Sequence, residues 1–125
     1  MNKRYHHIGL PAPDQDTPIP GETYVAGGDI WISSPDDHPQ RIEWLRYGPN
    51  NKKPLEKRAA PHICYEVDDL DAFLESIGSD AKPNEMGNPP FGRGVFIDDG
   101  SGIETEYLEV YPGRHWFDDE AKGLV

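Results

Sequence analysis

The stretch Pro61-His62-Ile63-Cys64-Tyr65-Glu66-Val67-Asp68-Asp69 predicts a strand that runs directly into a helix. Alternation with a period of two places His62, Cys64 and Glu66 on one face of this strand. The two aspartates end the strand and offer a helix N-cap, because a carboxylate accepts the free N–H groups of a first turn. One apolar helical stripe follows and stops before Gly78, and it consists of Leu70, Phe73, Leu74 and Ile77.

The composition indicates one globular domain with many turns. Of the 125 residues, 35% are hydrophobic and 28% are charged, and there are 13 prolines and 13 glycines. These values favour short strands over a helix bundle. The net charge of −11 argues against nucleic acid and anionic membranes as partners. The chain shows no apolar run of membrane-spanning length, no signal sequence and one cysteine, so we expect a cytoplasmic protein.

Further strands are expected on both sides of this strand–helix unit, at residues 6–10, 29–32, 41–47, 94–98 and 105–111. A short strand fits within residues 81–90, whereas the prolines of residues 11–22 favour a loop over a helix. Residues 1–125 then form a single domain. The first module covers residues of about 1–50 and the second module residues of about 61–112. A linker rich in Lys, Asn and Pro, at about 48–60, joins them, and a polar tail follows at 113–125.

The two halves contain a weak internal repeat. Each begins with a His-Ile strand, at His7-Ile8 and His62-Ile63, and ends with a strand that carries Glu, an aromatic residue and Leu, at Glu43-Trp44-Leu45 and Glu106-Tyr107-Leu108. The histidine and glutamate are 36 residues apart in the first half and 44 in the second. The same pair in the same order twice indicates two related modules.

Two histidines and two glutamates on strands are a candidate mononuclear metal site, formed by His7, Glu43, His62 and Glu106. Neutral imidazole suits divalent transition metals, and carboxylates add oxygen ligands and balance the charge. If a pseudo-twofold axis relates the halves, each contributes one histidine and one glutamate to a shared cavity. Four protein ligands leave up to two octahedral positions for water or substrate.

Other polar and aromatic residues are given simpler interpretations. Glu104 is an alternative to Glu106 as the metal ligand, because residues two apart on a strand point to the same face. Glu106 is preferred because it occupies the Glu–aromatic–Leu position of the repeat. We expect His6 to point away from His7, because adjacent strand residues point oppositely. The remaining expectations are solvated histidines at 38 and 115, a small buried residue at Cys64, and core positions for Trp31, Trp44 and Tyr107.

These residues resemble the vicinal oxygen chelate superfamily, which includes glyoxalase I, methylmalonyl-CoA epimerase, extradiol dioxygenases and the fosfomycin and bleomycin resistance proteins. His7-Ile8-Gly9-Leu10 is similar to its first strand, residues 62–70 to the start of its second module, and residues 96–109 to its closing hairpin. The resemblance implies an α+β fold in which two βαβββ modules form a cupped, barrel-like mixed sheet. Here the proline-rich residues 11–20 replace the first helix, and no basic cluster suited to glutathione carboxylates is visible.

The family's metal positions map onto His7, Glu43, His62 and Glu106, which implies one divalent ion: Ni, Zn, Co, Mn or Fe. This four-ligand set is similar to glyoxalase I, whereas bleomycin-binding members generally lack a metal. The resemblance therefore implies a lyase or isomerase acting on a small oxygenated substrate through a metal-stabilised enolate. Glu106, in preference to Glu43, would act as the base that shuttles the proton.

Two alternatives stay open. In the first, the cup binds a small compound without chemistry, and its acidity and three tryptophans suit a cationic aromatic ligand. In the second, an iron-dependent dioxygenase uses only two histidines and one glutamate, and Glu43 is then dispensable for metal binding. The resemblance also implies a homodimer.

Overall fold

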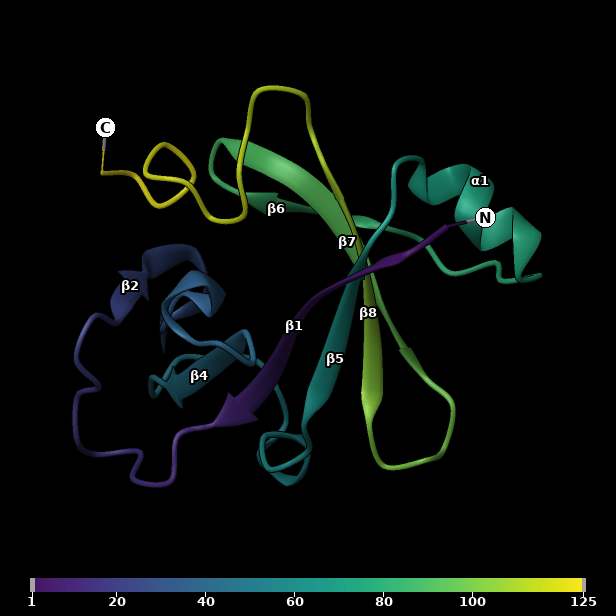
Figure 1. Ribbon diagram of the computed structural model, residues 1–125. Helices are drawn as coiled ribbons and strands as arrows, with labels where there is room; N and C mark the ends of the chain where they lie inside the picture. The colour runs from purple at the N-terminus through teal and green to yellow at the C-terminus, as the bar shows by residue number, and fades with distance from the viewer. Residues whose placement is uncertain (1, 125) are drawn as a thin grey trace.

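The computed structural model describes residues 2–124, which form one mixed eight-stranded sheet curled into a half-barrel, with a single α-helix (Figure 1). The strand order is β2-β3-β4-β1-β5-β8-β7-β6. The first half supplies β1 (Arg4–Pro11), β2 (Thr23–Val25), β3 (Ile30–Ile32) and β4 (Ile42–Tyr47). The second half supplies β5 (His62–Glu66), α1 (Leu70–Ser76), β6 (Asn84–Gly87), β7 (Pro90–Asp98) and β8 (Glu104–Val110). The chain is therefore an α+β protein.

The strand order is the same in both halves when it is read outward from the centre of the sheet. The antiparallel pair β1–β5 joins the halves. Each central strand then pairs in parallel with the last strand of its own half, β4 or β8. Antiparallel strands complete each side, with β3 and β2 beside β4, and β7 and β6 beside β8. The repeat in the sequence thus corresponds to two similarly paired sets of four strands.

The strand–helix unit of the second half forms as predicted. The Asp69 side chain accepts a hydrogen bond from the Ala72 backbone N–H at 3.0 Å, which satisfies a free donor of the first turn. Gly78, with φ of +72°, lies just beyond the helix in the left-handed region that glycine adopts most readily. The buried side chains of α1 pack on the sheet, and this core cluster consists of Leu70, Phe73, Leu74, Val67 and Val95.

The first half has an irregular segment in place of a helix, as the prolines predicted; all of residues 12–22 are described, and none is helical. Side chains hold this segment against β4. Gln15 donates from its amide to the carbonyls of Ala12 and Leu45 and accepts from the Tyr47 N–H, each at 2.9 Å. The half therefore keeps its packing without the helix.

Two strands differ from the sequence-based expectation. β2 was not predicted, because three residues are too few to show a period of two. β7 begins at Pro90 instead of residue 94. Pro90 is tolerated as the first strand residue. A Cβ at Gly92 would meet the backbone of Glu109, so glycine is what allows β7 to approach β8 there.

The C-terminal tail joins the two halves. Trp116 and Phe117 pack both against the cluster around Phe91 and Leu108 and against the cluster of Val25, Ile32 and Leu45. Arg114 anchors the tail by pairing with Asp118 at 2.7 and 2.8 Å. It also donates to the Pro90 carbonyl at 2.7 Å. The tail is thus part of the core and borders the concave face of the sheet.

Candidate metal centre

The four predicted ligands come together on the four central strands, with His7 on β1, Glu43 on β4, His62 on β5 and Glu106 on β8. All four are buried, with 1%, 5%, 5% and 3% of their surface exposed. Glu43 pairs with Gly9, and Glu106 pairs with Cys64. In each half the glutamate therefore lies beside the residue two positions after the histidine, so the two His–Glu pairs occupy equivalent places in the sheet.

The side-chain atoms lie at distances typical of ligands around one cation. The Nε2 atoms of His7 and His62 are 3.1 Å apart. Glu43 Oε1 is 3.7 Å from Nε2 of His7 and 3.6 Å from that of His62, and Glu106 Oε1 is 3.5 Å from both. Two atoms each about 2.1 Å from a metal are about 3.0 Å apart at 90° and about 3.6 Å apart at 120°. The observed separations fall close to this range.

Burial and neighbouring charges shift the pKa of each of these groups. Burial raises the pKa of Glu43 to about 7, an effect that His7 opposes and Glu106 reinforces. Burial would lower the pKa of His7, but the Glu43 and Glu106 carboxylates outweigh it and raise this pKa above its usual value. Burial would raise the pKa of Glu106, but the two histidines, chiefly His7, hold it below its usual value.

The fourth group, His62, is neutral near physiological pH because burial lowers its pKa to about 4. A protonated His7 and Glu43 beside an ionised Glu106 give a formal charge near zero. A divalent cation that displaced both protons would leave the charge of the centre unchanged, since two carboxylates would then balance it. The donor set therefore fits a divalent metal in charge, atom type and spacing.

The tightest part of the centre is the buried group of His7, His62 and Glu106, whose ligand atoms are close enough to hold a metal ion. Glu43, on β4 of the first half, faces both imidazoles. His62 Nδ1 is buried and has no hydrogen-bond partner among the described residues. His7 differs, because its Nδ1 lies 2.8 Å from Nδ1 of His6.

The expectation for His6 was wrong. The register between β1 and β5 shifts between Tyr5 and His7, which is a bulge at His6. A bulge redirects side chains, so adjacent residues no longer point to opposite faces. His6 is consequently half-buried beside His7 and does not point away from it. A bulge is set by the pairing of two strands and has no signal in the local sequence here.

An apolar cavity of about 200 Å³ adjoins the centre and reaches Glu43, His62 and Glu106. Its walls include Ile32, Leu45, Phe96, Trp116 and Phe117. Lys53 and Asn51, from the segment between the halves, are the polar residues at its margin. Phe96 and Lys53 were not expected at the site, and Trp116 was considered there only as one of three tryptophans suited to a cationic aromatic ligand. Their contact with the centre depends on tertiary packing, so no motif marks them.

The remaining candidates are not part of the four-residue set, although Cys64 Sγ lies within 4.8 Å of a ring nitrogen of His7. Glu104 pairs with Lys53 at 3.6 Å, which leaves Glu106 as the ligand on β8. His115 is exposed, as expected, while His38 is partly covered. Cys64 is fully buried, and burial raises the pKa of its thiol well above the usual value, which suits a core residue. Trp31 and Trp44 are only half-buried, so they are not part of the deep core.

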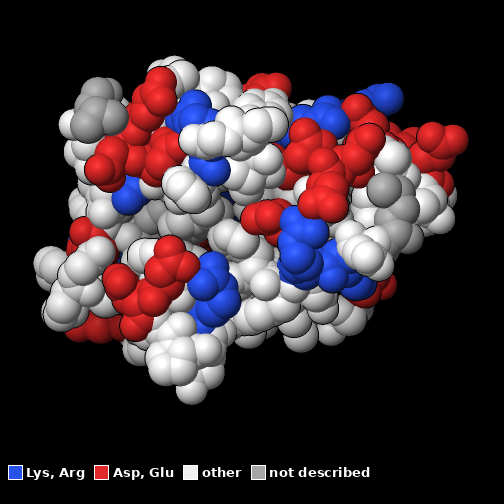
Figure 2. All heavy atoms as spheres, turned by 45° about the horizontal axis from the view of Figure 1, so that its top comes forward, with Lys and Arg blue, Asp and Glu red and all other residues white. Residues whose placement is uncertain are grey.

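The surface is rich in carboxylates. Figure 2 shows Asp and Glu side chains spread over much of one face, with smaller groups of Lys and Arg between them. An excess of negative charge raises the local concentration of cations around a protein. No helix within residues 2–124 is both long and apolar enough to cross a membrane.

Comparison with known proteins gives no relative: no protein-family model matches the chain, and a search of curated proteins finds no match. The functional argument therefore depends on the site itself, which is a buried pair of histidines and a pair of glutamates at the centre of a curled mixed sheet.

Proposed function

We propose that this chain is a metal-dependent enzyme of the vicinal oxygen chelate type, an isomerase or lyase that acts on a small oxygenated molecule. The observation that carries the proposal is the convergence of His7, Glu43, His62 and Glu106 from equivalent positions of the two halves. A buried polar cluster of this kind is costly for a structural role, because each group must be desolvated and paired.

The strand arrangement supports the proposed relationship to the glyoxalase-like proteins. Each half has four strands paired in the same order, and the second half has the full βαβββ succession that the resemblance implies. The first half lacks the helix but retains its four strands. Because fold alone does not define function, the four buried ligands carry more weight than this likeness.

The protein residues have separate tasks in this proposal. His7, His62, Glu106 and Glu43 would hold the metal through Nε2 and carboxylate oxygens. A bound divalent metal supplies Lewis-acid polarisation of a substrate oxygen. Burial of the centre excludes water and keeps the local dielectric low, which strengthens these interactions.

A proton shuttle is the second task, and the proposal gives it to Glu43 once its carboxylate has detached from the metal, in place of the Glu106 expected above. A general base works best when its pKa lies near the working pH. Burial raises the pKa of Glu43 to about 7, whereas that of Glu106 is held below its usual value. Glu43 and Glu106 both line the apolar cavity, so either carboxylate is within reach of a carbon next to a substrate carbonyl.

The cavity indicates the size and character of the substrate. At about 200 Å³ it is smaller than most ligand pockets, and its walls are mainly apolar. A compact aliphatic or aromatic molecule with neighbouring oxygens at one end fits these walls and the polar centre. Lys53 at the margin suits a substrate that also has a carboxylate.

A second candidate function has one observation in its favour. The tightest ligand group is His7, His62 and Glu106, two histidines and one carboxylate. This is the donor set of non-haem iron oxygenases, with open positions for dioxygen. In that case Glu43 is not a ligand, and the iron-loaded protein consumes oxygen in the presence of substrate.

Metal reconstitution tests the proposal. Metal-free protein should take up close to one equivalent of Ni, Co, Mn, Zn or Fe, measured by elemental analysis after desalting. Glu106→Gln should bind at least about tenfold more weakly, since it replaces a charged ligand. Glu104→Gln is the matched control, because it lies two residues away on β8 and contacts Lys53 instead. Uptake of none of these metals near one equivalent would overturn the proposal.

Activity assays then separate the two candidate functions. Loaded protein should catalyse exchange of the proton next to the carbonyl of small hydroxy- or keto-carbonyl compounds in deuterated water, and Glu43→Gln should abolish it. Oxygen uptake by the iron form, with metal affinity retained in Glu43→Ala, would support the dioxygenase instead.

A further inference from the structure

His6 occupies a position that ordinary strand geometry does not provide. The bulge in β1 turns it toward His7, and the two Nδ1 atoms lie 2.8 Å apart. Such a distance is a hydrogen bond in which one nitrogen donates and the other accepts. The rings meet edge to face, with centroids 5.0 Å apart and an interplanar angle of 75°.

Arg41 holds the bulge in place from the β4 side. Its Nε donates to the His6 carbonyl, and its own carbonyl accepts from the Ile8 N–H at 3.0 Å. Its guanidinium also pairs with Asp36 at 2.8 Å. Arg41 itself has φ of +55°, a costly conformation for this residue type, which persists only where surrounding contacts impose it. The backbone that follows His6, on both sides of His7, is therefore constrained.

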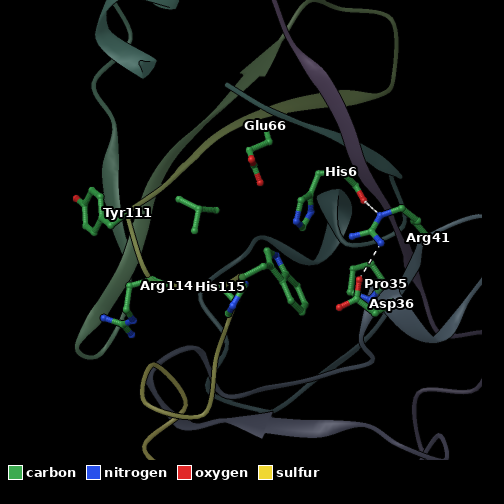
Figure 3. A pocket seen from close by; sticks show the side chains of 10 residues that line it. His6, Pro35, Asp36, Arg41, Glu66, Tyr111, Arg114 and His115 are labelled. Carbon is green, nitrogen blue, oxygen red and sulfur yellow. Dashed lines mark hydrogen bonds and ion pairs between the residues drawn. The ribbon is translucent and has the colours of Figure 1, made fainter. Parts of the chain in front are cut away.

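The ring of His6 borders a second cleft, of about 460 Å³ (Figure 3). In that view the His6 ring lies between Glu66 and Arg41, with His115 and Arg114 farther across the cleft. No described side chain other than that of His7 forms a hydrogen bond with the His6 ring. The ring can thus carry its proton on Nε2 and leave the Nδ1 lone pair free to accept.

A hydrogen bond at Nδ1 decides which nitrogen of His7 is free to bind a cation. When His7 Nδ1 donates to His6, the proton is fixed there and the Nε2 lone pair faces His62 and Glu106. Second partners of this kind orient metal-binding histidines. His62, the equivalent residue of the other half, has no such partner at Nδ1 among the described residues.

We propose that His6 is a positioning residue of the metal centre: it accepts a hydrogen bond from His7 Nδ1 and thereby fixes the tautomer and ring orientation in which His7 Nε2 binds the metal. This inference rests on the proposed metal-dependent function. It assigns unequal roles to the two halves, because His7 has a hydrogen-bond partner at Nδ1 whereas His62 has none there among the described residues.

Metal affinity is the first test. Co²⁺ affinity is measured by chelator competition for the wild type, His6→Phe, His6→Asn and His115→Phe. Loss of a second partner typically weakens metal binding 10–100-fold, so we expect about that loss for His6→Phe. His6→Asn retains an acceptor near Nδ1 and should stay within about threefold of the wild type. His115→Phe is the control, because His115 lines the same cleft without contacting His7.

The hydrogen bond itself is measured without any metal. In ¹⁵N-labelled metal-free protein we expect a through-hydrogen-bond coupling between the Nδ1 atoms of His6 and His7. In the Zn²⁺ form, the His7 ¹⁵N shifts should report a proton on Nδ1. Both signals should be absent in His6→Phe.

The outcomes separate this inference from the proposed function. Wild-type affinity in His6→Phe, or equal loss in His6→Asn and His6→Phe, overturns the role of His6 while leaving the metal centre intact. Absence of the Nδ1–Nδ1 coupling in the metal-free wild type also overturns it, whatever the metal affinity. A wild type that binds no metal overturns both.

Discussion

Gly9 faces His62 across the β1–β5 pair, and the His62 imidazole occupies the space that a Cβ at position 9 would need. Glycine is thus required at this position for the close approach of the ring. The equivalent residue of the second half is Cys64, which lies opposite His7. A small residue lies beside each histidine. At position 9 in the first half, beside His62, there is room only for glycine.

Gly9→Ala is therefore expected to displace His62 from the centre. Overpacking of this kind costs about 1–3 kcal/mol of stability, and the loss of one ligand should weaken metal binding at least about tenfold. Metal titration together with urea unfolding measures both effects. Gly27→Ala is the control, because a Cβ there meets nothing within 4 Å. Unchanged metal affinity in Gly9→Ala would contradict the assigned position of His62.

The contribution of Glu43 to the stability of the protein without metal should fall as pH rises from 5 to 8. Burial raises the pKa of Glu43 to about 7 from its usual value of 4.5, so the folded state holds a proton that the unfolded state releases. Stability from such a raised pKa is present below about 4.5 and is lost as pH rises through 7.

Glu43→Gln removes this titration and tests it. Relative to the wild type, the variant should gain on the order of 1–3 kcal/mol between pH 5 and pH 8. Urea unfolding in the presence of a chelator gives the difference at each pH. An identical difference at the two pH values would show that Glu43 does not titrate in this interval.

Metal binding should release protons, and more of them at pH 6 than at pH 8. The raised pKa values of His7 and Glu43 leave both groups largely protonated at pH 6, and a cation must displace these protons. We expect close to two protons per metal at pH 6 and fewer at pH 8, with affinity rising over this interval. Calorimetry in buffers of different ionisation heat counts the protons. Release near zero at pH 6 would exclude the proposed protonation.

Trp116→Ala should destabilise the whole domain. Trp116 packs against core clusters of both halves and lies with its ring centroid 5.7 Å from that of His7. Because it is only half-buried, we expect a loss of about 2–4 kcal/mol, near the lower end for such truncations. Leu55→Ala, at a side chain 76% exposed, should change stability by less than about 0.5 kcal/mol. Equal unfolding midpoints for these two variants would show that the tail does not join the halves.

The candidate ligands could be predicted from the sequence because alternation and repetition are local properties. His62 and Cys64 share a buried face, as the period of two requires. Strand alternation could not decide between Glu104 and Glu106 as the ligand, because both point to the same face. The repeat favoured Glu106, and in the structure Glu106 is buried. Which glutamate shuttles the proton stays a prediction, since the pKa of a buried carboxylate depends on neighbours from other strands.

The sequence by itself determined the strand–helix unit, the absence of a helix after β1, and which four side chains are available to a metal. Each of these follows from hydrogen-bonding and side-chain directions within a few consecutive residues. Only the tertiary structure decided that His6 turns toward His7, that Trp116 and Phe96 line the cavity, and that Gly9 makes room for His62. These contacts depend on the register between strands distant in the chain, because a shift of one residue reverses every side chain of a strand.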